Sequence, residues 1–85
     1  LERHGLEERT LVVFTSDNGC AAYIGEGKCS NLPFNGAKGT YFEGGIRVPM
    51  IAAWPGRLPA GSVIDEPVAS FDWTVSTLGL AGLPW

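Results

Sequence analysis

The clearest hydrophobic pattern in the chain is a pair of short apolar runs that predict two β-strands. Residues 10–15 form an almost continuous run of apolar and β-branched side chains, which suits a strand buried on both faces of a parallel sheet. Residues 48–54 predict a second strand. Pro49 must lie near the start of this strand or on an edge, because proline cannot donate a ladder hydrogen bond.

Helical signals occupy the two ends of the chain. Residues 1–6 are predicted to form the last turn of a helix, with Gly5 just after the C-cap, where a left-handed glycine is common. Residues 73–81 predict a second helix, which Ser70 or Asp72 can cap.

Residues 16–45, between the predicted strands, are rich in glycine, asparagine and serine and have no clear period. Loops of more than about 15 residues in compact domains are usually functional or disordered, so we interpret this segment as a functional loop. The order helix end, strand, long loop, strand, helix predicts an α/β fold, as a slice of an α/β sandwich. Two strands do not form a stable parallel sheet alone, so we expect the other strands to come from elsewhere.

Composition narrows the class of protein. The chain has 85 residues and a formal net charge of −3, which allows at most one small domain and offers no basic patch for nucleic acid. No apolar run approaches the roughly 20 residues of a membrane-spanning helix. The N-terminus is not a signal peptide and lacks an initiator methionine, so we expect the chain to begin within a longer protein.

The loop contains both cysteines of the chain, Cys20 and Cys29. They could form a disulfide, since a flexible loop of this length closes easily, or they could remain free, because sequence does not fix the geometry. A zinc site is disfavoured, because no CxxC pair and no second histidine accompany them.

The first candidate site, residues 16–19, directly follows the first predicted strand. Ligand sites of open α/β sheets gather at the carboxyl ends of the strands. Asp17 offers a carboxylate and Asn18 an amide oxygen, which are ligands that Ca²⁺ and Mg²⁺ prefer. Gly19 lets the backbone turn tightly beside a metal. An ordinary turn is the alternative, because Asp, Asn and Gly are all common turn formers.

The second candidate site, residues 36–49, places one lysine, one glutamate and one arginine among glycines. Glu43 and Arg47 are four positions apart, and we interpret them as a structural pair whose charge-assisted hydrogen bond holds the loop. A direct role of this pair in substrate binding is the alternative.

Together, residues 13–19, 36–49 and 54–56 closely resemble the type I sulfatases, the formylglycine-dependent enzymes of the alkaline-phosphatase superfamily. The resemblance runs from about residue 6 to residue 82. It implies that residues 1–85 are a C-terminal part of a sulfatase catalytic domain, with an alkaline-phosphatase-like α/β sandwich fold.

The resemblance also implies roles for individual residues. Asp17 and Asn18 stand where sulfatases place two ligands of the active-site divalent cation, usually Ca²⁺, with Mg²⁺ as the alternative. Lys38 stands where the family has a lysine that contacts the sulfate group, so it is both the substrate-binding and the catalytic candidate. A lysine supplies a compact charge that can stabilise negative charge as the S–O bond breaks.

The formylglycine nucleophile of sulfatases arises in a C-x-P/A-x-R motif, and neither Cys20 nor Cys29 begins a matching sequence. We therefore expect the nucleophile, two further metal-binding aspartates and the catalytic histidines outside this chain. Alone, the chain is expected to be inactive.

Alternatives to a sulfatase are a phosphodiesterase or phosphonate monoester hydrolase of the same superfamily, and a truncated, non-enzymatic module. The expected partners are an aryl or carbohydrate sulfate and the remainder of the catalytic domain. The family is commonly periplasmic, secreted or lysosomal, and the sequence does not choose among these.

Overall fold

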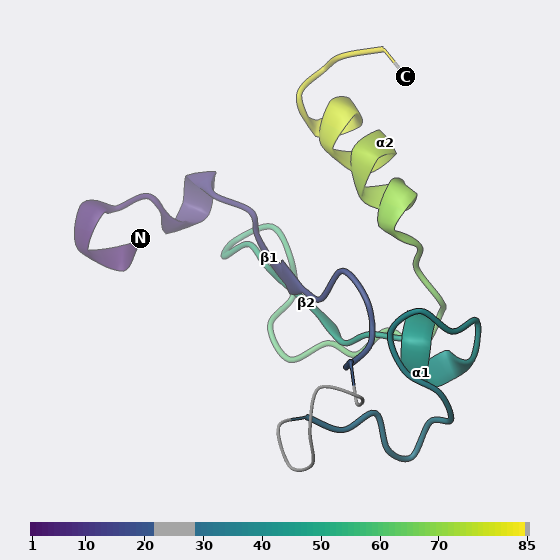
Figure 1. The fold of residues 1–85 in the computed structure, drawn as a ribbon. Helices are drawn as coiled ribbons and strands as arrows, with labels where there is room; N and C mark the ends of the chain where they lie inside the picture. Colours follow the sequence, from purple (N-terminus) through teal and green to yellow (C-terminus); the bar gives the residue numbers. More distant parts are fainter. Residues whose placement is uncertain (22–28, 85) are drawn as a thin grey trace.

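The computed structural model describes residues 1–21 and 29–84, and Figure 1 shows its elements arranged around a two-stranded ribbon. In chain order they are two 3₁₀ turns (Glu2–His4 and Glu7–Arg9), β1 (Val12–Thr15), α1 (Glu43–Ile46), β2 (Met50–Ala53) and α2 (Ser70–Leu80). Strands and helices are both present, as the α/β prediction requires.

The two strands pair antiparallel, so the predicted parallel arrangement is wrong for this pair. Val12 lies opposite Ala53 and Thr15 lies opposite Met50. The chain leaves β1 at Thr15 and enters β2 at Met50, at the same end of the ribbon. The two strands therefore run in opposite directions. The end of β1 and the start of β2 therefore coincide, and α1 lies just beyond that end of the ribbon (Figure 1).

The prediction that the first strand is buried on both faces is also wrong for the described chain. Every residue of β1 and β2 is exposed, and Phe14 is 70% exposed. Two strands expose both faces to solvent unless another layer covers them. The radius of gyration of 16.1 Å exceeds the value of about 12 Å expected for a compact chain of this length. The described chain therefore has no apolar core of its own.

The N-terminal prediction is partly correct. Residues 1–6 do not end an α-helix, because the segment forms short 3₁₀ turns instead. Gly5 nevertheless has the predicted left-handed conformation, with φ of 60°, and its N–H donates to the Glu2 carbonyl. The glycine signal for a chain reversal was thus correct, although the helix type was not.

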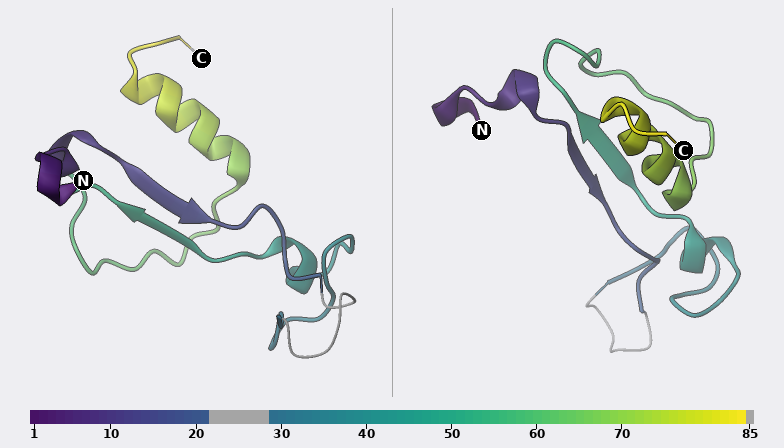
Figure 2. Two further views of the ribbon diagram at one scale, coloured as in Figure 1. Left: turned by 60° about the vertical axis from the view of Figure 1, so that its left-hand side comes forward. Right: turned by 90° about the horizontal axis from the view of Figure 1, so that it is seen from above.

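Helix α2 begins earlier than predicted, at Ser70, with Ala69 at the N-cap. The Asp72 carboxylate accepts a hydrogen bond from the Ala69 backbone N–H at 2.8 Å, so Asp72 acts from the third position of the helix. The helix runs beside the ribbon (Figure 2), where the Trp73 indole N–H points to the Met50 sulfur. Among the described residues, no helix is long and apolar enough to cross a membrane.

Helix α1 is a feature that the sequence prediction missed, because its residues were assigned to the loop. It has one turn and contains Gly44 and Gly45, which are the only residues of the described chain that are fully buried. The tightest packing therefore lies next to the candidate site rather than between the strands.

Candidate functional site

The turn after β1 presents a carboxylate to solvent. The Ser16 hydroxyl donates to the Asn18 carbonyl at 2.7 Å, and the Asn18 side-chain amide donates to an Asp17 carboxylate oxygen. That hydrogen bond, together with the positive charge of Lys38, holds the pKa of Asp17 below its ordinary value. Asp17 is exposed and Asn18 is half-buried. An ionised, accessible carboxylate next to an amide oxygen is suited to a hard cation.

Lys38 lies on a second tight turn. The Thr40 backbone N–H donates to the Ala37 carbonyl at 3.0 Å, and the Thr40 hydroxyl donates to the same carbonyl at 2.8 Å. Gly39, the residue after Lys38, has φ of 87°, a conformation that glycine adopts at little steric cost. The turn thus holds the Lys38 backbone and leaves its side chain exposed.

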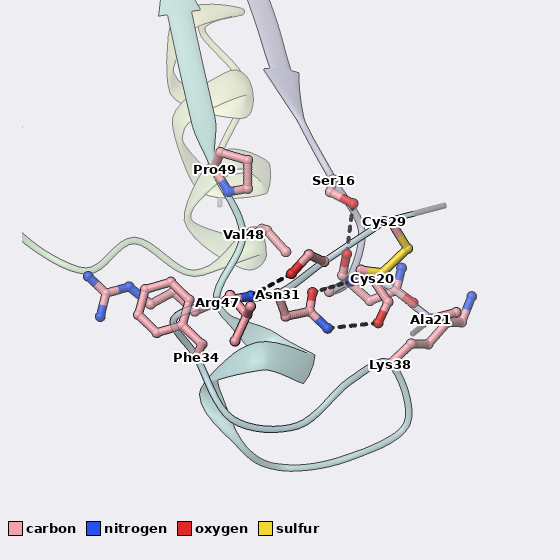
Figure 3. A pocket seen from close by; sticks show the side chains of 14 residues that line it. Ser16, Cys20, Ala21, Cys29, Asn31, Phe34, Lys38, Arg47, Val48 and Pro49 are labelled. Carbon is pink, nitrogen blue, oxygen red and sulfur yellow. Dashed lines mark hydrogen bonds between the residues drawn. A yellow bond between two sulfur atoms is a disulfide. The ribbon is translucent and has the colours of Figure 1, made fainter. Parts of the chain in front are cut away.

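The two turns meet at one pocket. The Lys38 backbone N–H donates to the Cys20 carbonyl at 3.0 Å, which joins the lysine turn to the chain leaving Asp17 and Asn18. Asn18 and Lys38 both line a pocket of about 570 Å³. Figure 3 shows Lys38 beside Cys20 and Ala21 at one side of this pocket. The structure therefore brings Asn18 and Lys38 to one pocket, while Asp17 does not line the pocket and is exposed beside Asn18.

Backbone packing around α1 holds the turns in place. The Gly19 N–H donates to the Gly45 carbonyl at 2.9 Å, and the Gly44 N–H donates to the Asn35 carbonyl at 2.7 Å. A Cβ atom added at Gly45 would lie 2.3 Å from the Thr40 carbonyl oxygen, a distance too short for real atoms. Adjacent glycines after Glu43 were the only sequence signal for this close approach, since glycine permits it.

We predict that Gly45→Ala destabilises the site. The added methyl group has no room, and overpacking of this kind typically costs about 1–3 kcal/mol. The thermal midpoint of the full-length protein should fall. Gly79→Ala is the matched control, because a Cβ at Gly79 in α2 meets no atom within 4 Å. Equal midpoints for the two variants would contradict the packing described here.

Glu43 and Arg47 contact each other across one turn of α1. The Arg47 Nη1 lies 3.1 Å from the Glu43 Oε2, and the side chains are 63% and 60% exposed. Exposed pairs of this kind contribute at most about 1 kcal/mol. The Arg47 guanidinium carbon also lies 4.7 Å from the centre of the Phe34 ring. In Figure 3, Arg47 and Lys38 extend toward opposite sides of the pocket. The predicted contact between Glu43 and Arg47 is thus present, whereas the structural role of the pair stays a prediction.

Cys20 and Cys29 form a disulfide, with their Cα atoms 5.9 Å apart. The sequence left this pairing open. The disulfide links Cys29 to the residue that accepts the Lys38 hydrogen bond, so it belongs to the same cluster. Residues 22–24 of the motif compared with the formylglycine sequence lie outside the described residues.

Asp17 and Asn18 carry oxygen atoms of the kind that a divalent cation prefers, but two residues are too few to form a complete site. Ca²⁺ takes 6–8 oxygen ligands, and Asp17 with Asn18 would supply only part of that set. Within residues 1–21 and 29–84, no three His, Cys, Asp or Glu side chains gather as a metal site. Further ligands would have to come from outside the described residues, in line with the two further aspartates that the family resemblance implies.

Comparison with characterised proteins supports the resemblance. A family model described as Sulfatase matches residues 1–83. The N-acetylgalactosamine-6-sulfatase of Canis lupus familiaris is 48% identical over 79 residues, covering 92% of this chain and 15% of that protein. Arylsulfatase A of Homo sapiens is 46% identical over 81 residues, covering 94% of this chain and 16% of that protein.

A third relative, the steryl-sulfatase of Mus musculus, is 43% identical over 93 residues, covering 99% of this chain and 15% of that protein. The chain thus spans about a sixth of the length of the relatives it matches. No solved structure matches it. Since the family model covers nearly the whole chain, the chain belongs to the sulfatase family.

Proposed function

We propose that this chain supplies part of the active site of a sulfuric ester hydrolase. The observation that carries the proposal is the meeting of Asn18 and Lys38 at one pocket, with the exposed Asp17 carboxylate adjacent. A cation site and an ammonium group at one pocket match the needs of a sulfate ester, whose anionic oxygens both groups attract.

In this proposal, Asp17 and Asn18 hold a divalent cation, with Ca²⁺ as the expected ion and Mg²⁺ as the alternative. The bound cation would supply Lewis-acid polarisation and a template for the substrate. The low pKa of Asp17, set by the Asn18 amide and by Lys38, keeps the carboxylate charged and ready to bind the ion. Asn18 donates its N–H to Asp17, which leaves the Asn18 amide oxygen as the second ligand.

Lys38 binds the sulfate group and stabilises the charge that develops on it. Its ammonium group presents three donors on a flexible stem, while the turn and the hydrogen bond to Cys20 fix its backbone. A donor aimed at developing charge acts most strongly where water is excluded. The side chain is exposed in this chain, so that exclusion would come from the substrate and from the remainder of the catalytic domain.

The remainder of that domain completes the fold and the chemistry. The uncovered faces of β1 and β2 suit packing inside an alkaline-phosphatase-like α/β sandwich, and the formylglycine nucleophile belongs to that remainder. The names of the relatives include an N-acetylgalactosamine-6-sulfatase and an arylsulfatase. They support an aryl or carbohydrate sulfate as the substrate class.

The full-length protein should hydrolyse an aryl sulfate with a higher kcat/KM than the matching aryl phosphate diester or phosphonate monoester. The three esters share one chromogenic leaving group, so one absorbance assay compares them. Residues 1–85 alone serve as the blank and should release no product. A preference for the phosphate diester or the phosphonate would favour the alternative enzymes of the superfamily and reject the sulfatase proposal.

A further inference from the structure

Asn31 links the two halves of the site through its side chain. Its Oδ1 accepts the Cys20 backbone N–H at 2.6 Å. Its Nδ2 donates to the Cys20 carbonyl at 2.9 Å and to the Gly36 carbonyl at 3.1 Å. Cys20 lies two residues after Asn18, and Gly36 lies two residues before Lys38. One half-buried amide therefore links the chain after the Asp17–Asn18 turn to the chain before the Lys38 turn. Figure 3 shows Asn31 at the centre of the pocket.

The backbone partners fix the orientation of this amide. A backbone N–H can only donate and a carbonyl can only accept, so one end of the side chain must be the oxygen and the other the nitrogen. Among the twenty amino-acid side chains, only those of asparagine and glutamine combine an acceptor and two N–H donors in one planar amide group. The glutamine side chain is one methylene longer. Position 31 therefore requires an amide side chain of this length, and a polar side chain of another kind would not replace it.

The Cys20 carbonyl is the shared point of the cluster. It accepts both the Asn31 amide and the Lys38 backbone N–H at 3.0 Å. Without Asn31, the lysine turn would keep one link to Cys20 and lose the second link through Gly36. The Lys38 amine lies at the end of a long side chain, so a small rotation of its turn displaces the amine further.

We propose that Asn31 is a positioning residue that sets Lys38 relative to the cation ligands Asp17 and Asn18. The inference rests on the proposed function, because Lys38 is the group through which Asn31 acts. Loss of a side chain that orients a metal ligand typically costs about 10–100-fold in metal affinity or activity. The same loss is expected here.

The test is a double-mutant cycle in the full-length enzyme with an aryl sulfate as substrate. Asn31→Ala removes all three hydrogen bonds, whereas Asn31→Asp keeps the shape and the acceptor and loses both donations. Each should lower kcat/KM by roughly 10-fold or more. In a Lys38→Ala background the same substitutions should cost less than about twofold, because the group that they misplace is already absent.

A second readout is the inhibition constant of inorganic sulfate, which should rise in both Asn31 variants and change little in the Lys38→Ala background. Asn35→Asp and Asn35→Ala are the matched controls. Asn35 is exposed, and among the described residues its side chain makes no hydrogen bond. Both controls should keep the parental kcat/KM.

Several outcomes would overturn the proposal. Equal losses in the two backgrounds would mean that Asn31 acts independently of Lys38. A loss for Asn31→Asp but not for Asn31→Ala would assign the effect to the new charge. If neither variant folds, Asn31 is a folding determinant instead. Parental activity of Lys38→Ala itself would reject the proposed function, whereas a slow Lys38→Ala enzyme with normal Asn31 variants would reject only the role of Asn31.

Discussion

The full-length enzyme carrying Asp17→Ala is expected to lose both its divalent cation and its turnover. Asp17 is an exposed carboxylate next to Asn18, which lines the pocket, and hard cations depend on charged oxygen ligands. The drop in kcat should exceed the roughly 10²–10³-fold that follows removal of a single charge-stabilising donor. Elemental analysis of the purified protein measures the cation directly and independently of activity.

Two further variants make the Asp17 test specific. Asp17→Asn keeps an oxygen ligand and removes the charge, so it should bind the cation more weakly than the parent and more tightly than Asp17→Ala. Asp65→Ala removes a carboxylate from an exposed segment and should retain both metal and activity. A full complement of metal in Asp17→Ala would show that this carboxylate is not a ligand.

The Lys38→Ala enzyme should be slower by about 10²-fold or more, mostly in kcat. The substitution removes the amine that we propose binds the sulfate, while the turn survives because Ala37, Gly39 and Thr40 hold it through backbone atoms and the threonine hydroxyl. The cation content should stay at the parental level, which separates this variant from Asp17→Ala.

Lys38→Arg offers a sharper version of the same test. Arginine keeps the positive charge in a larger, planar group. A rate between those of Lys38→Ala and the parent would attribute the loss in Lys38→Ala to the missing charge. A rate equal to that of Lys38→Ala would show that the size and shape of the lysine side chain are also required. Arg3→Ala, which removes a cation from the exposed N-terminal turn, controls for net charge. Unchanged turnover in Lys38→Ala would remove the lysine from the mechanism.

Local features of the fold were predictable from sequence, whereas the pairing of its strands was not. The β-branched run at residues 10–15 and the apolar run at residues 48–54 located β1 and β2 to within two residues. Whether two strands run parallel or antiparallel depends on the path of the chain between them, and residues 16–45 carried no periodic signal for that path. The burial of strands likewise depends on layers that the described chain does not contain.

The candidate site divides in the same way. Residue types and their order nominated Asp17, Asn18 and Lys38, because carboxylate, amide and amine chemistry is readable one residue at a time. The contacts that bring Asn18 and Lys38 to one pocket could not be predicted from the sequence. They run through backbone atoms at Gly44 and Gly45 and through Asn31, and the sequence does not reveal which carbonyl a given N–H will reach. The assignment of metal and sulfate roles itself stays a prediction.

The burial of Gly44 and Gly45 has a consequence for how new specificities could arise. Because these glycines join the two turns through main-chain atoms, the framework of the candidate site places few demands on the identity of neighbouring side chains. Leu32 and Tyr41 are 84% and 98% exposed on the same loop. Substitutions at such exposed positions can change the surface beside the pocket while the main-chain framework stays the same.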